Sequence, residues 1–181
     1  MNLPNKLTLV RVGMIPVFLV VLMGGFLDMQ TARIAAVAIF ALASFTDFLD
    51  GYIARKYKLI TNFGKFMDPL ADKLLVCAAL VAMVALGDIA AWVVIVIISR
   101  EFLVTGLRLI AVEQGAVLAA GVWGKLKTVS QMLMIMLVLL SIQIPVVQVV
   151  GQALIWLSAA LTVVSGVEYF VKNIHVIKDV K

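Results

Sequence analysis

The forty residues from Thr128 to Val167 contain no charged side chain. A helix that crosses the hydrocarbon core of a bilayer needs about 20 apolar residues, so this run is long enough for two spans. Gln143, Pro145 and Gln148 mark the turn expected between them. The chain as a whole is 64% hydrophobic and 14% charged, whereas soluble domains average roughly 45–50% and about 25%. We therefore expect the lipid bilayer to be its solvent.

Charged residues divide the rest of the chain into four shorter apolar runs, at 12–27, 34–46, 74–87 and 89–99. With the long run they predict six membrane-spanning helices, near 9–27, 32–57, 65–86, 89–111, 121–142 and 147–170. No stretch rich in proline, serine or charge resembles a linker. The sequence predicts an all-α integral membrane bundle formed by one domain over residues 1–181. No small-residue cleavage motif precedes the first span, which we expect to be retained.

Lysine and arginine are distributed unevenly along this topology. Six spans place both termini on one side, together with the connections around 56–66 and 110–124. Fourteen of the 15 basic residues fall on that side and only Arg33 on the other, which predicts cytoplasmic termini by the positive-inside rule. The net charge of +5 then reflects topology and attraction to anionic lipid head groups. We expect membrane lipid, and no nucleic acid, as a partner.

Three apolar runs are too short to span the membrane by themselves. Residues 34–46, for example, make about 20 Å of helix, against roughly 30 Å of hydrocarbon. The spanning helices must therefore include charged residues, which are Asp47 and Asp50 in the second, Asp68 and Asp72 in the third, and Arg100 and Glu101 in the fourth. Charges at membrane depth are rare and usually functional.

The four aspartates have spacings that place each pair on one helix face. Asp47 and Asp50 are i and i+3, and Asp68 and Asp72 are i and i+4. We expect residues 62–65 to form a tight cytoplasmic connection that makes the two helices antiparallel neighbours. All four carboxylates then converge on one site.

Such a cluster needs counter-charges. Four ionised carboxylates about 6 Å apart would repel by roughly 3 kcal/mol per pair at an effective dielectric constant near 20. Six pairs would approach or exceed the stability of a domain, about 5–15 kcal/mol. Protons or cations must neutralise the cluster, two divalent ions match four charges, and ligands that are all oxygen favour Mg²⁺ or Mn²⁺ over zinc. A salt-bridge network with Arg55, Lys65 and Lys73 is the structural alternative.

The gapped pattern around these aspartates resembles the signature of the CDP-alcohol phosphatidyltransferase family at all eight fixed positions and at every spacing. The positions are Asp47, Asp50, Gly51, Ala54, Arg55, Gly64, Asp68 and Asp72. The resemblance implies a six-span fold and a homodimer. It implies that Asp47, Asp50, Asp68 and Asp72 hold two divalent ions, Mg²⁺ or Mn²⁺, with Asp72 also the general base. Its implied nucleotide contacts are Asn5, Thr8, Asp47, Gly51, Ala54, Arg55 and Asp68, although Arg55 has the alternative role of a membrane-interface anchor.

Three further stretches, at 4–11, 100–108 and 124–128, resemble the phosphatidylglycerophosphate synthases of bacteria, a branch of this family. This resemblance implies transfer of a phosphatidyl group from CDP-diacylglycerol to sn-glycerol 3-phosphate, with release of CMP. It places the chain in the bacterial cell membrane with its active site facing the cytoplasm. The acceptor phosphate needs a basic pocket, for which the candidates are Arg100, Thr105, Arg108 and Lys125. We expect Glu101 to orient Arg108.

Other interpretations stay open at this point. Arg100 and Glu101 are also compatible with a structural ion pair beside lysines that only set topology, and Lys127 is undecided between the two roles. The acceptor alcohol is alternatively serine, inositol phosphate or phosphatidylglycerol. A divalent-cation channel or transporter is a different class, which the lack of a matching acidic site on the outer half of the spans disfavours.

Overall fold

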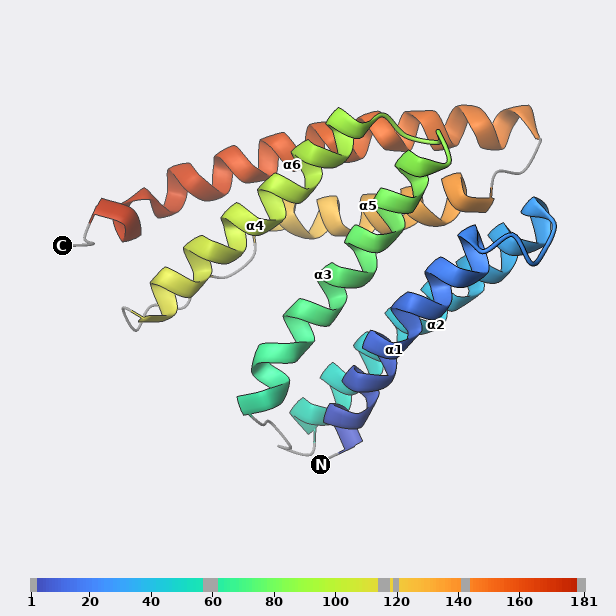
Figure 1. Cartoon of the computed structure of the whole chain (residues 1–181). Coiled ribbons are helices and arrows are strands. Elements are labelled where there is room, and N and C mark those ends of the chain that lie inside the picture. Colours follow the sequence, from blue (N-terminus) through green and yellow to red (C-terminus); the bar gives the residue numbers. More distant parts are fainter. Residues whose placement is uncertain (1–2, 57–61, 114–117, 119–120, 141–143, 179–181) are drawn as a thin grey trace. The chain divides into compact units, whose positions relative to one another are not determined.

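In the computed structural model of the chain, every regular element in the described residues is an α-helix (Figure 1). The structure describes residues 3–56, 62–113, 118, 121–140 and 144–178. The helices are α1 (Leu3–Met23), α2 (Met29–Lys56), α3 (Asn62–Ala85), α4 (Ala91–Glu113), α5 (Val122–Leu140) and α6 (Pro145–Lys178). The all-α prediction is confirmed, and each helix overlaps one of the six predicted spans.

Two predicted helix ends are wrong because local backbone chemistry, rather than hydropathy, sets them. The first helix ends at Met23 instead of residue 27. Gly25 has a positive φ of 71°, and a Cβ on Gly24 would lie 2.4 Å from the ring of Phe26, so glycine is required at this turn. Residues 62–65 form the first turn of α3 rather than a connection. The link between α2 and α3 falls in residues 57–61, outside the described residues.

The start and end of α6 also differ from the prediction. The helix begins at Pro145, because proline is favoured at the first helical position, where its missing N–H costs no hydrogen bond. Gln148 therefore lies inside the helix rather than in the turn, and Gln143 is outside the described residues. At the other end α6 extends to Lys178, past the predicted residue 170, with a kink at Asn173, where the backbone is non-helical. Hydropathy locates the membrane-embedded part of a helix, and a helix can extend beyond it.

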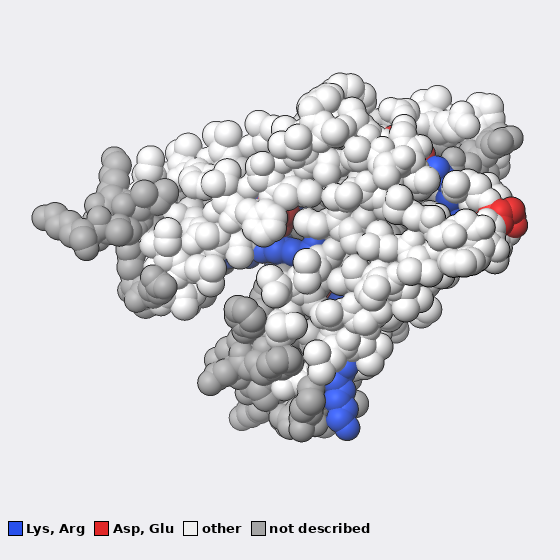
Figure 2. Space-filling view, in the orientation of Figure 1, with Lys and Arg blue, Asp and Glu red and all other residues white. Residues whose placement is uncertain are grey.

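The helices have the apolar surfaces of a membrane protein. Four described segments are long and apolar enough to cross a bilayer: Asn5–Met23, Met29–Asp47, Val122–Leu140 and Pro145–Ile174. Many large apolar side chains point outward, among them Val10, Leu42, Ile95 and Val163. Most of the molecular surface seen in Figure 2 is uncharged. In water such a continuous apolar surface would aggregate, whereas lipid chains solvate it.

Contacts within the chain divide it into two compact units, which are described separately. Unit 1 comprises Met1–Asp88 with Leu139–Ile142, and unit 2 comprises Ile89–Val138 with Gln143–Lys181. Each unit has its own buried side chains. The expectation of a single domain over residues 1–181 stays a prediction.

Unit 1 is built on α1, which packs against α2 and α3, while α2 also contacts α3. The rings of Phe18 and Phe40 meet with centroids 6.4 Å apart. Ala32, Ala36 and Ala43 are buried on α2, and their small side chains let the neighbouring backbone approach closely. This packing brings the part of α2 that carries the first signature aspartate against α1.

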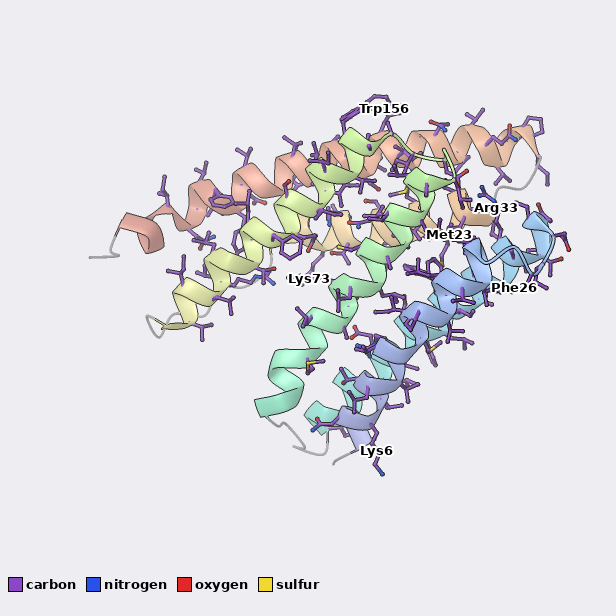
Figure 3. The ribbon with its side chains drawn as sticks, in the orientation of Figure 1. Lys6, Met23, Phe26, Arg33, Lys73 and Trp156 are labelled. Atoms are coloured by element: carbon purple, nitrogen blue, oxygen red, sulfur yellow. The ribbon has the colours of Figure 1, made fainter. Side chains whose placement is uncertain are left out.

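An ion pair ties together the other end of unit 1. Arg33, near the start of α2, donates to both carboxylate oxygens of Asp88 at 2.8 and 2.9 Å and to the carbonyl of Leu139 at 3.4 Å. Figure 3 shows Arg33 and Lys6 at opposite ends of the α1 and α2 pair. The single basic residue predicted for the outer side thus has a partly buried counter-charge.

Unit 2 contains α4, α6 and most of α5. Helices α4 and α6 pack together, and the rings of Trp92 and Trp156 meet at a tilt of 49° with centroids 5.7 Å apart. Near the end of α4, Val104, Leu107 and Ala111 form a buried cluster with Tyr169 of α6. The polar residues discussed below lie around this cluster and the start of α5.

Candidate functional site

The signature aspartates lie on α2 and α3 of unit 1, as predicted. Asp47 is 37% exposed and Asp72 is partly buried; both offer carboxylate oxygens, which suit a hard cation such as Mg²⁺ or Mn²⁺. The side chains of Asp50 and Asp68 are outside the described residues. Among the side chains that are described, no three acidic, histidine or cysteine residues come close enough to hold a metal ion.

Arg11 is a direct partner of the first signature aspartate. Its side chain is fully buried, and its terminal nitrogen donates to Oδ1 of Asp47 at 2.6 Å. Its Nε donates to the carbonyl of Ala43, one turn earlier on α2, at 3.3 Å. Two hydrogen bonds from one planar guanidinium restrict how Asp47 can rotate. One carboxylate oxygen is thereby used by arginine.

The same face of α1 carries two of the residues assigned to the nucleotide by resemblance. Asn5 and Thr8 are buried, and they precede Arg11 at intervals of three residues, so all three side chains point into unit 1. Thr8 and Arg11 are completely buried. The remaining predicted nucleotide contacts besides Asp47, namely Gly51, Ala54, Arg55 and Asp68, have side-chain positions outside the described set.

From the sequence, Arg11 was expected to be a cytoplasmic cation within the stretch 4–11, and no contact with the aspartates was predicted for it. The missed signal is periodicity, because Arg11, Phe18 and Leu22 lie at i, i+7 and i+11 and are all buried on one face of α1. A charged residue on a buried face needs an opposite charge on a neighbouring helix. That requirement points to the aspartates of α2 and α3.

A second charged cluster lies in unit 2. Lys127 of α5 is only 2% exposed and donates to the carboxylate of Glu101 on α4. A terminal nitrogen of Arg100 lies 3.5 Å from the same oxygen of Glu101. Two cations therefore share one carboxylate, and this largely buried triad carries an excess positive charge. Such an excess is suited to an anionic ligand.

Two glycines give Arg100 its space. A Cβ at Gly166 of α6 would lie 3.1 Å from Cγ of Arg100, and a Cβ at Gly124 would lie 3.5 Å from one of its terminal nitrogens. Nε of Arg100 is buried and has no hydrogen-bond partner among the residues that the structure describes. The side chain also lines an otherwise mainly apolar groove of about 510 Å³ between α4 and α6. Arg100 is thus enclosed by protein but retains hydrogen-bonding capacity.

Two of the predicted acceptor residues are placed differently from this triad. The hydroxyl of Thr105 donates to the carbonyl of Glu101 at 2.7 Å, so in this conformation its oxygen can only accept a hydrogen bond from a ligand. Lys125 is exposed, whereas Lys127 is buried, because residues two apart on a helix point in opposite directions. The structure therefore brings Lys127, rather than Lys125, to Arg100 and Glu101.

The burial of Lys127, like that of Arg11, could have been predicted from the period of the buried residues along its helix. Lys127, Ser130, Gln131, Met134 and Ile135 are all buried on α5, and their spacing is that of one helical stripe. The three polar positions continue the apolar stripe toward the start of the helix. A lysine on this stripe is oriented toward the protein interior.

Arg108 is held by a residue that the sequence analysis did not single out. Its Nε donates to the hydroxyl of Tyr169 at 3.0 Å, and the guanidinium carbon lies 5.4 Å from the centre of the tyrosine ring. The expectation that Glu101 orients Arg108 is wrong, because Glu101 pairs with Arg100 and Lys127 instead.

Long apolar helices that also carry buried or partly buried charged clusters define a helical membrane protein with polar sites among its helices. This chain belongs to the CDP-alcohol phosphatidyltransferase family, which matches residues 1–164.

Curated relatives match over nearly the whole chain. A Bacillus subtilis protein named CDP-diacylglycerol–glycerol-3-phosphate 3-phosphatidyltransferase is 46% identical, over 98% of this chain and 97% of its own length. A Haemophilus influenzae protein of the same name is 37% identical, over 93% and 91%. A probable phosphatidylglycerophosphate synthase of Mycobacterium tuberculosis is 42% identical, over 99% and 85%.

Proposed function

We propose that this chain transfers the phosphatidyl group of CDP-diacylglycerol to sn-glycerol 3-phosphate, giving phosphatidylglycerophosphate and CMP. The names of its full-length relatives support this reaction. The structural observation that carries the choice of acceptor is the excess buried positive charge of Arg100 and Lys127 around Glu101. An acceptor alcohol that bears a phosphate carries the negative charge that suits a positively charged cluster.

In this proposal unit 1 binds the nucleotide end of the lipid substrate. Divalent-metal dependence is general in the family, and the donor set of Asp47, Asp50, Asp68 and Asp72 fits two Mg²⁺ or Mn²⁺ ions chemically. Such ions, when bound, neutralise charge on the diphosphate. Asn5 and Thr8 on α1, with Gly51, Ala54 and Arg55 on α2, contact the cytidine diphosphate. Arg11 holds Asp47 in place while this happens.

Asp72 is the proposed general base. It takes the proton from a free hydroxyl of glycerol 3-phosphate, and the hydroxyl oxygen then attacks the phosphorus that carries diacylglycerol. A new phosphorus–oxygen bond forms, the bond from that phosphorus to the bridging oxygen breaks, and CMP leaves with that oxygen. Arg100, Arg108 and Lys127 bind the acceptor phosphate, with Lys125 and Thr105 as further candidates.

The membrane arrangement belongs to the same proposal. All six helices span the bilayer of the bacterial cell membrane, both termini lie in the cytoplasm, and the active site faces the cytoplasm, where glycerol 3-phosphate is soluble. The distribution of lysine and arginine supports this orientation. Residues 1–181 form a single catalytic domain in this proposal. Two copies of the chain form a homodimer.

An acceptor panel tests the reaction. Purified protein is incubated with labelled CDP-diacylglycerol and Mg²⁺, and with glycerol 3-phosphate, serine, inositol phosphate or phosphatidylglycerol. We expect CMP and phospholipid to form in equal amounts with glycerol 3-phosphate, and neither after exhaustive EDTA treatment. Product with another alcohol instead would reassign the acceptor within the family. Release of CMP with none of the alcohols would sink the proposal.

A further inference from the structure

The contact with Tyr169 restrains the side chain of Arg108, as expected for a group that binds a ligand. Arg108 is exposed near the end of α4, where an arginine side chain ordinarily samples many rotamers. Here its Nε–H is directed at the tyrosine hydroxyl, 3.0 Å away, and its guanidinium carbon lies 5.4 Å from the ring centre. The exposed arginine is thus fixed at two points by one residue of α6.

Tyr169 is itself rigidly placed. It is 6% exposed and packs with Val104, Leu107 and Ala111 of α4. These residues flank Arg108 along the helix, so the ring bridges α6 to the turns of α4 that present the guanidinium. If the ring were needed only for packing, phenylalanine would serve equally well at this position. The tyrosine hydroxyl adds the hydrogen bond that it accepts from Arg108.

The remaining donors of this pair are unused. An arginine has five N–H groups, and the bond to Tyr169 uses the one on Nε. The four on the terminal nitrogens have no hydrogen-bond partner in the described part of the chain. A phenol that accepts a hydrogen bond keeps its own hydrogen for donation. Together the two side chains present donors and no negative charge, which matches the oxygens of a phosphate.

We propose that Tyr169 is a positioning residue for the acceptor phosphate, acting by holding Arg108 with its two terminal nitrogens directed to the ligand. This inference rests on the proposed function, because it assigns the phosphate to glycerol 3-phosphate. Tyr169 lies beyond residue 164, where the match to the family ends. Its proposed role therefore rests on its contact with Arg108. If the guanidinium of Arg108 is already held in place before the ligand binds, less conformational entropy is lost on binding.

Tyr169→Phe tests the proposal, because it deletes only the hydroxyl and keeps the buried ring. We expect the KM for glycerol 3-phosphate to rise about tenfold, as a displaced binding group requires, while kcat and the KM for CDP-diacylglycerol change less than about twofold. Ser165→Ala is the matched control. It deletes another buried hydroxyl of α6, which donates to the carbonyl of Thr162 at 3.2 Å, and we expect all three constants to stay unchanged.

A double-mutant cycle separates action through Arg108 from a general effect on the fold. Arg108→Ala alone should raise the KM for glycerol 3-phosphate, and adding Tyr169→Phe should raise it no further. An unchanged KM in Tyr169→Phe, or independent effects of the two substitutions, would overturn the inference. If Arg108→Ala leaves this KM unchanged while the wild type still releases CMP with glycerol 3-phosphate, the inference fails and the proposed reaction stands. Thermal unfolding of each variant reports whether it is folded.

Discussion

Two arginines of unit 1 illustrate what a buried charge requires at the scale of single residues. Arg11 and Arg33 are both buried and both pair with an aspartate, at 2.6 and 2.8 Å. Removing a charge from water is costly unless an opposite charge and further hydrogen bonds compensate it. The pairs differ in their aspartates, since Asp47 belongs to the family signature and Asp88 does not. Arg33 is therefore a matched control for Arg11.

Arg11→Lys is expected to weaken Mn²⁺ binding by about tenfold, the lower end of the effect seen when a group that orients a metal ligand is lost. Lysine keeps the positive charge but cannot donate to Asp47 and to the Ala43 carbonyl with the fixed geometry of a guanidinium. Arg33→Lys should leave Mn²⁺ affinity unchanged. Electron paramagnetic resonance of Mn²⁺ titrated into each purified protein measures the affinities. Equal weakening in both variants would indicate a loss of bundle packing instead.

At the scale of helices, each functional face continues a packing face. On α1 the buried stripe of Phe18 and Leu22 leads to Arg11, and on α5 the stripe of Ile135 leads to Lys127. The apolar part of each stripe fixes the rotation of its helix against its neighbours. Because that rotation is fixed, the polar residues further along the same stripe are also directed inward. Packing thus positions the charged groups.

The start of α2 provides a test with a pH dependence. Asp28 precedes the helix, and its carboxylate accepts a hydrogen bond from the backbone N–H of Thr31 at 2.9 Å. This bond to the backbone of Thr31, followed by one to its side chain, lowers the pKa of Asp28 from 3.8. A lowered pKa means that the cap stabilises fully above pH 3.8 and that this contribution is lost as the pH falls through the lower folded value.

We therefore expect Asp28→Ala to lower the melting temperature at pH 7, because an N-terminal donor of α2 loses its partner. The difference from the wild type should shrink as the pH is taken below 3.8. Tryptophan fluorescence during heating in detergent measures both effects. Gln30→Ala, in the same exposed turn, should melt like the wild type at every pH. A difference that grows on acidification would contradict the assignment of the cap.

At the scale of the whole molecule, the six helices imply an even number of membrane crossings if each spans the bilayer. The basic residues then lie almost entirely on one side, and Arg33, the exception, is paired with Asp88. The excess of lysine and arginine on one side is the asymmetry that orients a chain during insertion.

Cysteine labelling tests this topology. Cys77 is the one cysteine of the chain, and Cys77→Ala removes it. In this background, Asp28→Cys should react with a membrane-impermeant maleimide added to intact cells. Lys6→Cys and Lys172→Cys should react only after the membrane is permeabilised, since the proposed orientation places both ends of the chain in the cytoplasm. Labelling of position 172 but not of position 6 in intact cells would require an odd number of spans.

The all-helical class and the order of the helices were predictable, because a bilayer forces apolar runs of this length into helices that satisfy their own backbone hydrogen bonds. Helix ends were less so, because turn chemistry sets them. The glycine turn after Met23 and the start of α6 at Pro145 are examples. The placement of the signature aspartates on two helices was also predictable, since the spacing within each pair matches the period of a helix.

The sequence by itself determined the apolar helices suited to a bilayer and the helical spacing of the carboxylates, because each depends on residues close together in the chain. Only the tertiary structure decided the partners. Arg11 reaches an aspartate 36 residues away, Lys127 a glutamate 26 away, and Arg108 a tyrosine 61 away. Such pairs depend on the rotation and packing of separate helices, which the periodicity of any one helix does not specify.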